Sequence, residues 1–119
     1  LKMNEIGDHK IVIEKNGNMS RKDMALLMQE IIEDVEGARD GGQEEYARNE
    51  GNAFANFERI GAWLGKSREE VLMVYLLKHV DGIISWVDGN DSQREDVTGR
   101  ITDAITYLCL LRGMVESER

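Results

Sequence analysis

Proline is absent from this 119-residue chain, cysteine occurs once, and only 6% of the residues are aromatic. Without proline, the twelve glycines are the residues that interrupt regular structure. The single Cys109 excludes an internal disulfide, which fits a reducing cytoplasm. Because leucines flank Cys109, we expect its thiol to be buried and inert. No apolar run approaches the ~18 residues of a membrane helix, and we find no signal-peptide pattern.

Basic residues are also scarce, since 15 Lys and Arg stand against 23 Asp and Glu, for a net charge of −8. Binding to nucleic acid phosphates needs a basic face, and the sequence has no Lys/Arg cluster of that kind. We therefore expect no direct binding to nucleic acid or to a membrane. Hydrophobic residues, at 41%, suffice for a core. The length is typical of one domain, so we predict a single domain over residues 1–119.

The N-terminal part, residues 1–19, is expected to form a strand and a turn. Residues 10–14 are β-prone and precede Asn16-Gly17, which is a turn signal. We find no second strand-like run in the chain. A lone strand leaves backbone groups unsatisfied, so this one is expected to pair with a neighbouring chain. That expectation favours a dimer or a higher homo-oligomer.

Residues 20–116 are expected to form a bundle of four helices. Sequences of the capping-box type begin at Ser20, Ser67 and Ser92, each before an apolar pattern of helical period. Asn52 is the candidate cap of the remaining helix. The fold class is therefore all-α, a four-helix bundle with a short N-terminal strand.

Gly37 is expected to end the first helix, with residues 39–42 as a polar loop. The third helix, over about residues 71–87, is apolar around most of its circumference. Such a helix lies at the centre of its domain or against a partner subunit, which again favours an oligomer.

Charged side chains interrupt the third and fourth helices. Lys78 and Asp81 lie three residues apart, and so do Arg100 and Asp103, so each pair shares a helix face. Charges that point inward must pair or hold a ligand. Two interpretations stay open. Either each pair closes on itself, or the cations bind phosphate and the carboxylates bind a metal.

Two further groups of residues are candidates for a binding site. Glu30 and Glu33 form an E-x-x-E pair on one helix face, and such carboxylates can share Mg²⁺. With Asp81 and Asp103 they are the candidate metal ligands. The candidate ligand-binding residues share the ability to contact a base or a phosphate, and they are Lys78, Arg100, Arg59, Asn56, Phe54 and Tyr46.

A family resemblance rests on short motifs in residues 44–112. They are Tyr46, Asn56-Phe57-Glu58-Arg59-Ile60, Leu77-Lys78, and Asp96, Asp103 and Tyr107. The segment resembles small phage-type domains called MazG-like or nucleotide-modification-associated. The resemblance implies an all-α dimer or tetramer related to nucleoside-triphosphate pyrophosphohydrolases, whose E-x-x-E and E-x-x-D pairs bind Mg²⁺. Glu30 and Glu33 would supply the first pair.

The second acidic pair departs from that pattern, because Lys78-His79-Val80-Asp81 has a cation where the first carboxylate belongs. We therefore expect a cytoplasmic, phage-type protein that binds a nucleotide or a nucleotide-derived ligand. Whether it also hydrolyses one with Mg²⁺ stays open. The alternative is an acidic phage protein that inhibits a host protein through its helical surface.

Overall fold

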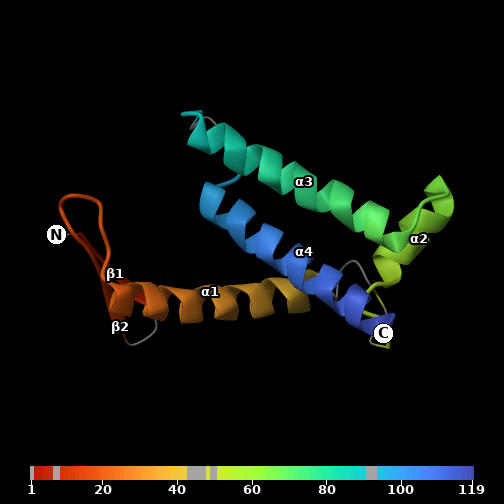
Figure 1. Ribbon diagram of the computed structural model, residues 1–119, viewed down its shortest axis with the longest axis horizontal. Coiled ribbons are helices and arrows are strands. Elements are labelled where there is room, and N and C mark those ends of the chain that lie inside the picture. The colour runs from red at the N-terminus through yellow and green to blue at the C-terminus, as the bar shows by residue number, and fades with distance from the viewer. Residues whose placement is uncertain (1, 7–8, 43–47, 49–50, 91–93) are drawn as a thin grey trace. The chain divides into compact units, whose positions relative to one another are not determined.

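The computed structural model describes residues 2–6, 9–42, 48, 51–90 and 94–119. In these ranges the chain is mostly helical, with four helices and one two-stranded sheet (Figure 1). The all-α fold class is confirmed at this level. By contacts between residues the chain divides into two compact units, Leu1–Asp34 and Val35–Arg119. The elements are β1 (Lys2–Ile6), β2 (His9–Ile13), α1 (Arg21–Gly42), α2 (Ala55–Leu64), α3 (Arg68–Val87) and α4 (Val97–Ser117).

The unit Leu1–Asp34 contains an antiparallel hairpin. The predicted strand is present as β2, but it pairs with β1 in the register Lys2 to Ile13 and Ile6 to His9. The expectation that the chain holds no partner strand is therefore wrong. Because β2 is already paired within the chain, an unpaired strand no longer supports an oligomer. The sequence of β1 has weak β-propensity and therefore does not reveal a strand. Strand formation depends on cross-strand contacts more than on intrinsic preference.

The Asn16-Gly17 turn that leaves β2 is confirmed. Gly17 adopts a φ of +84° and its amide donates to the Glu14 carbonyl. Positive φ is readily accessible to glycine because it has no Cβ.

Helix α1 begins as expected and ends later than expected. The Ser20 hydroxyl accepts the amide of Asp23, which satisfies one of the free donors of the first turn. Gly37 does not end the helix, and residues 39–42 are not a loop, because α1 continues to Gly42. Glycine in a helix interior lowers its stability but does not break the hydrogen-bond ladder.

The connection from α2 to α3 is short and depends on two glycines. Gly65 ends α2 with a φ of +67°, in the left-handed region. A Cβ on Gly61 would lie 2.5 Å from the carbonyl oxygen of Lys66, so only glycine fits this close approach. The capping box at Ser67 is confirmed, since Ser67 and Glu70 exchange side-chain to backbone hydrogen bonds of 3.1 Å.

Two other helix starts differ from the expectation. The N-cap of α2 is Phe54, and the side chain of Asn52 instead accepts the Phe54 amide at 3.0 Å. Ser92, the predicted start of the capping box of the fourth helix, lies outside the described residues, and α4 begins later, at Val97. Its N-cap is Asp96, whose carboxylate accepts the Thr98 amide at 3.2 Å. Several residues near a helix start can serve as caps, so a capping motif alone leaves the start ambiguous.

Helices α3 and α4 run antiparallel and side by side, and α2 packs on the N-terminal part of α3 (Figure 1). Their shared core consists of fully or nearly fully buried side chains, namely Phe57, Val71, Leu72 and Met114. Cys109 does not belong to it, because its side chain is exposed, contrary to expectation. No helix in the described part of the chain is long and apolar enough to span a bilayer.

Candidate functional site

A polar cavity of about 330 Å³ lies in the unit Val35–Arg119. Its walls carry three cations, one amide and three aromatic rings, and the lining residues are Arg48, Asn56, Arg59, Ile60, Trp63, Tyr75, Lys78 and Tyr107. Small-molecule sites measure about 300–1,000 Å³ and combine apolar walls with a few polar groups. The cavity is therefore of a size and composition suited to a small anionic ligand.

Helical spacing explains how the chain brings these residues together. On α2, Asn56, Arg59 and Trp63 follow at intervals of three and four residues, so they share one face. On α3, Tyr75 and Lys78 are three residues apart. Tyr107 contributes the wall from α4. The packing of α2, α3 and α4 thus brings Arg59 and Lys78 to one cavity, and Arg48 joins them from the segment before α2.

Stacked rings form the inner wall of the cavity. The rings of Tyr75 and Tyr107 are nearly parallel, with centroids 6.0 Å apart and planes 13° apart. Phe57 meets both edge-on, at 5.9 Å and 6.2 Å. These rings face one another, whereas Trp63 is 73% exposed. Trp63 is thus the lining ring best placed to stack on a planar ligand.

The cavity includes three of the six residues that the sequence marked for ligand binding, namely Asn56, Arg59 and Lys78. The ammonium group of Lys78 forms no ion pair with any residue in the described ranges, and neither does the carboxylate of Asp81. The closed Lys78–Asp81 pair is therefore not formed among these residues. Tyr46 lies outside the described residues.

Phe54 does not line the cavity and instead packs at the far end of α4. Its ring lies 3.1 Å from the position that a Cβ of Gly113 would occupy. The guanidinium carbon of Arg68 lies 4.9 Å from the centre of the same ring, within the range of a cation–π contact. Phe54 is thus a structural residue that supports Arg68.

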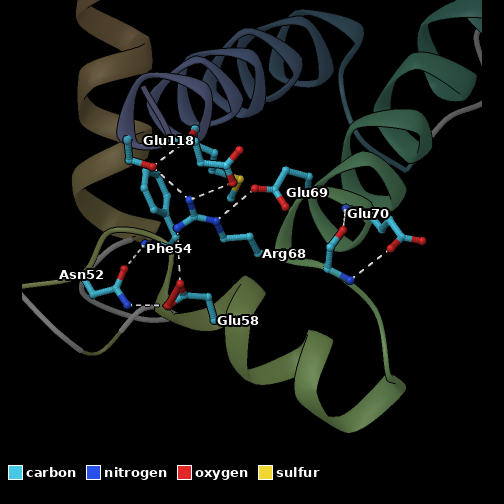
Figure 2. A network of polar contacts seen from close by, with 10 residues as sticks. Asn52, Phe54, Glu58, Arg68, Glu69, Glu70 and Glu118 are labelled. Carbon is cyan, nitrogen blue, oxygen red and sulfur yellow. Dashed lines mark hydrogen bonds and ion pairs between the residues drawn. The ribbon is translucent and has the colours of Figure 1, made fainter.

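Arg68 joins the three helices of this unit (Figure 2). Its guanidinium donates to Glu69 at 3.1 Å, to Glu58 of α2 at 3.3 Å and to Ser117 of α4 at 2.9 Å. The hydrogen bond to Glu69 raises the pKa of Arg68 above its ordinary value. The five donors of a planar guanidinium allow one side chain to make all these contacts.

Arg100 also lies outside the cavity lining. Its guanidinium and Cδ lie 2.5–2.6 Å from the point where a Cβ on Gly82 would be, so the side chain covers that glycine. Its guanidinium also approaches Glu95, with 4.0 Å between Nη1 and Oε2. Asp103, its predicted partner, lies instead beside His79, with 3.8 Å between Oδ2 and Nε2.

The four predicted metal ligands are distributed over the chain. Asp81 and Asp103 lie in the unit Val35–Arg119. Glu30 and Glu33 lie on α1 within Leu1–Asp34. Desolvation first, and then the negative charges of Glu33 and Asp34, raise the pKa of Glu30. A divalent cation would relieve this repulsion, so the E-x-x-E pair remains a candidate for Mg²⁺.

Sequence reasoning missed several residues of the cavity and its surroundings. Trp63 carries a usable signal, because it continues the helical spacing of Asn56 and Arg59. Arg48 carries none, since it lies between α1 and α2, with a φ of 56°. Sequence reasoning also does not select His79 as a site residue, yet its ring is close to two carboxylates, Glu95 and Asp103.

An apolar groove of about 720 Å³ adjoins the polar cavity, and Ile60 and Tyr75 line both. Leu64 and Val74 contribute to it and are 66% and 68% exposed. Its lining is mostly apolar, so it suits a hydrophobic side chain better than a charged ligand.

Comparison with protein-family models, with curated proteins and with solved structures gives no match.

Proposed function

We propose that the polar cavity binds a nucleotide or a nucleotide-derived ligand. The observation that carries the proposal is the meeting of Arg48, Arg59 and Lys78 around one cavity in a chain with a net charge of −8. Clustered cations in an otherwise acidic protein attract a small anion of high charge density, such as a phosphate chain.

The remaining lining fits the other end of such a ligand. Asn56 offers both a donor and an acceptor, as the edge of a base requires. Trp63 is exposed enough to stack on a base. The phosphate end would lie against Arg59 and Lys78. This division of roles resembles that of other nucleotide sites, with charge at one end and stacking at the other.

The phage-type, cytoplasmic setting implied by the MazG-like resemblance belongs to the same proposal. So does hydrolysis with Mg²⁺ at Glu30 and Glu33, as the second activity. The competing proposal, inhibition of a host protein through the helical surface, expects closed Lys78–Asp81 and Arg100–Asp103 pairs and no pocket. The cavity favours the nucleotide site over it, as does Lys78, whose ammonium forms no ion pair within the described residues.

Self-association through α3 completes the proposal. Val74, Leu77, Ile84 and Val87 are 52–69% exposed and follow one another at helical spacing. They span about 20 Å of helix at 1.5 Å per residue. A second copy of the chain offers the same stripe, and identical apolar stripes can pair about a twofold axis. Light scattering should report a dimer, and Leu77→Glu should shift it to the monomer. A wild-type monomer would contradict this part.

Tryptophan fluorescence tests the nucleotide site directly. The chain has two tryptophans, so in Trp86→Phe the emission comes from Trp63 alone. Titration with nucleoside mono-, di- and triphosphates, with and without Mg²⁺, should quench this emission. The quenching should be lost in Lys78→Ala and Arg59→Ala and kept in Lys22→Ala, which removes an equal charge from α1.

Chromatography of the same mixtures separates binding from hydrolysis. Formation of a monophosphate and pyrophosphate, abolished by Glu33→Ala, would establish the pyrophosphohydrolase. Binding without turnover would establish the binder. If no nucleotide changes the Trp63 emission or releases heat in calorimetry, the nucleotide proposal fails and a protein partner becomes the better explanation.

A further inference from the structure

His79 lies between two carboxylates at the contact of α3 and α4, outside the lining of the polar cavity. Its Nδ1 is 4.0 Å from Oε2 of Glu95, and its Nε2 is 3.8 Å from Oδ2 of Asp103. One ligand atom from each of the three residues lies within 4.8 Å of the other two. Helix α3 supplies the imidazole, α4 supplies Asp103, and the segment before α4 supplies Glu95.

The imidazole is buried but not hydrogen-bonded at Nδ1. The His79 side chain is only 8% exposed, and its Nδ1 is a buried atom without a hydrogen-bond partner in the described structure. Leaving a buried polar nitrogen unsatisfied is destabilising. The ring is held by stacking on Tyr107, with centroids 5.6 Å apart. Among the described residues no protein group hydrogen-bonds to this nitrogen, and a bound cation beside the two carboxylates would satisfy it.

The separation of Nδ1 from Glu95 fits a bridging metal ion better than a direct hydrogen bond. Nitrogen-to-oxygen hydrogen bonds measure about 2.7–3.2 Å, and the 4.0 Å between Nδ1 and Oε2 exceeds that. Two bonds of a zinc ion, at about 2.0–2.1 Å each, span at most about 4.2 Å. Because one ion binds only one ring nitrogen, it would bridge the unpartnered Nδ1 to Glu95, and the Asp103 carboxylate would turn toward it as the third ligand. The carboxylates of Glu95 and Asp103 are 47% and 42% exposed, so they have room to rotate inward and an ion has access from solvent.

The donor set also selects the type of ion. One imidazole nitrogen with two carboxylate oxygens suits Zn²⁺ and its first-row neighbours, whereas Mg²⁺ and Ca²⁺ prefer oxygen alone. Arg100 lies 4.0 Å from the same oxygen of Glu95 and compensates one of the two negative charges. One negative charge remains beside the imidazole, and it attracts a cation.

We propose that His79, Glu95 and Asp103 bind one Zn²⁺-type divalent ion between α3 and α4. Three protein ligands leave a coordination position for water. The site shares only Asp103 with the predicted metal ligands Glu30, Glu33, Asp81 and Asp103, and it does not depend on a nucleotide in the polar cavity. Tyr107 stacks on the imidazole and also lines that cavity. The Tyr107 ring would therefore lie between the ion site and a ligand bound in the cavity.

The test is a titration of the intact protein with Zn²⁺ by calorimetry and with Co²⁺ by visible absorption, without nucleotide. We expect one ion per chain and a Co²⁺ spectrum of low coordination number. His79→Gln and Asp103→Asn should each weaken binding by at least about 100-fold, since even outer-sphere changes cost about 10–100-fold.

Two matched variants serve as controls. His9→Gln removes the other histidine of the chain, and Asp88→Asn removes the exposed aspartate at the C-cap of α3, outside the cluster. Both should bind as the wild type does. Binding that survives in His79→Gln, or that is lost in His9→Gln, would overturn the proposal. Absence of binding in the wild type would also overturn it.

Because His79 is buried, loss of binding in His79→Gln has to be separated from loss of folding. Glu95→Gln and Asp103→Asn alter half-exposed side chains and should preserve the circular dichroism spectrum. If both variants fold and both bind Zn²⁺ as tightly as the wild type, the proposal is wrong irrespective of how His79→Gln behaves.

Discussion

The imidazole of His79 stacks on the phenol ring of Tyr107, with centroids 5.6 Å apart and planes 25° apart. Tyr107 also stacks on Tyr75, with centroids 6.0 Å apart. One ring of α4 therefore contacts both the candidate metal site and the wall of the polar cavity. A substitution of Tyr107 should therefore affect both the candidate metal site and the polar cavity.

Tyr107→Leu should lower the free energy of unfolding by about 1–3 kcal/mol, because it removes ring contacts worth about 0.5–1.5 kcal/mol each. Tyr107→Phe keeps the rings and should lose less. Chemical denaturation followed by circular dichroism measures both. Equal losses in the two variants would show that the hydroxyl, and not the stacking, matters.

Trp63→Leu should separate stacking from charge in the polar cavity. We expect about a two- to tenfold weaker affinity for a nucleoside monophosphate, from the loss of about 0.5–1.5 kcal/mol of ring contact. Affinity for inorganic pyrophosphate should not change, because Lys78 and Arg59 are intact. Calorimetry with both ligands provides the comparison, and Trp86→Leu is the matched control. A parallel loss for pyrophosphate would argue against a stacking role.

Gly37→Ala should raise the free energy of unfolding by about 0.5–1 kcal/mol, because Gly37 lies within α1 and alanine restricts the unfolded chain. Gly65→Ala should lower it, since Gly65 has a φ of +67° at the end of α2. Urea denaturation of both variants checks the pair. A destabilised Gly37→Ala would mean that the helix ends there after all.

Gly82→Ala should destabilise the protein by about 1–3 kcal/mol, because its Cβ would collide with the Arg100 side chain. A Cβ on Gly99 of α4 would have no atom within 4 Å, so Gly99→Ala should leave the stability of the protein unchanged or raise it. Thermal unfolding compares them. Similar midpoints for the two variants would indicate that Arg100 moves away without cost.

Glu30→Gln should stabilise the protein at neutral pH. Desolvation first, and then Glu33 and Asp34, raise the pKa of Glu30 in the folded state, so its ionised form opposes folding. The penalty is complete above the folded pKa and disappears as the pH falls below the unfolded value of about 4.3. The gain from the substitution should vanish over the same range. Thermal unfolding against pH measures it, with Glu36→Gln as the control on the same helix.

The sequence by itself determined where most helices lie and which residues could serve a ligand. Hydrogen bonds within a helix are local, so periodicity and the Ser67 capping box located α3 closely. The helical spacing of Asn56 and Arg59 placed them on one face, and Lys78 stood out as a cation on an apolar helix. These three residues do meet in one cavity.

The tertiary structure decided what depends on contacts between distant residues. The partner of β2 is formed by β1, whose sequence has little strand preference. Phe54 became a support for Arg68, and Arg100 covers Gly82, because packing selects one of several faces that a sequence allows. His79, Glu95 and Asp103 converge only because α3 and α4 run antiparallel, and no spacing along the chain encodes that meeting.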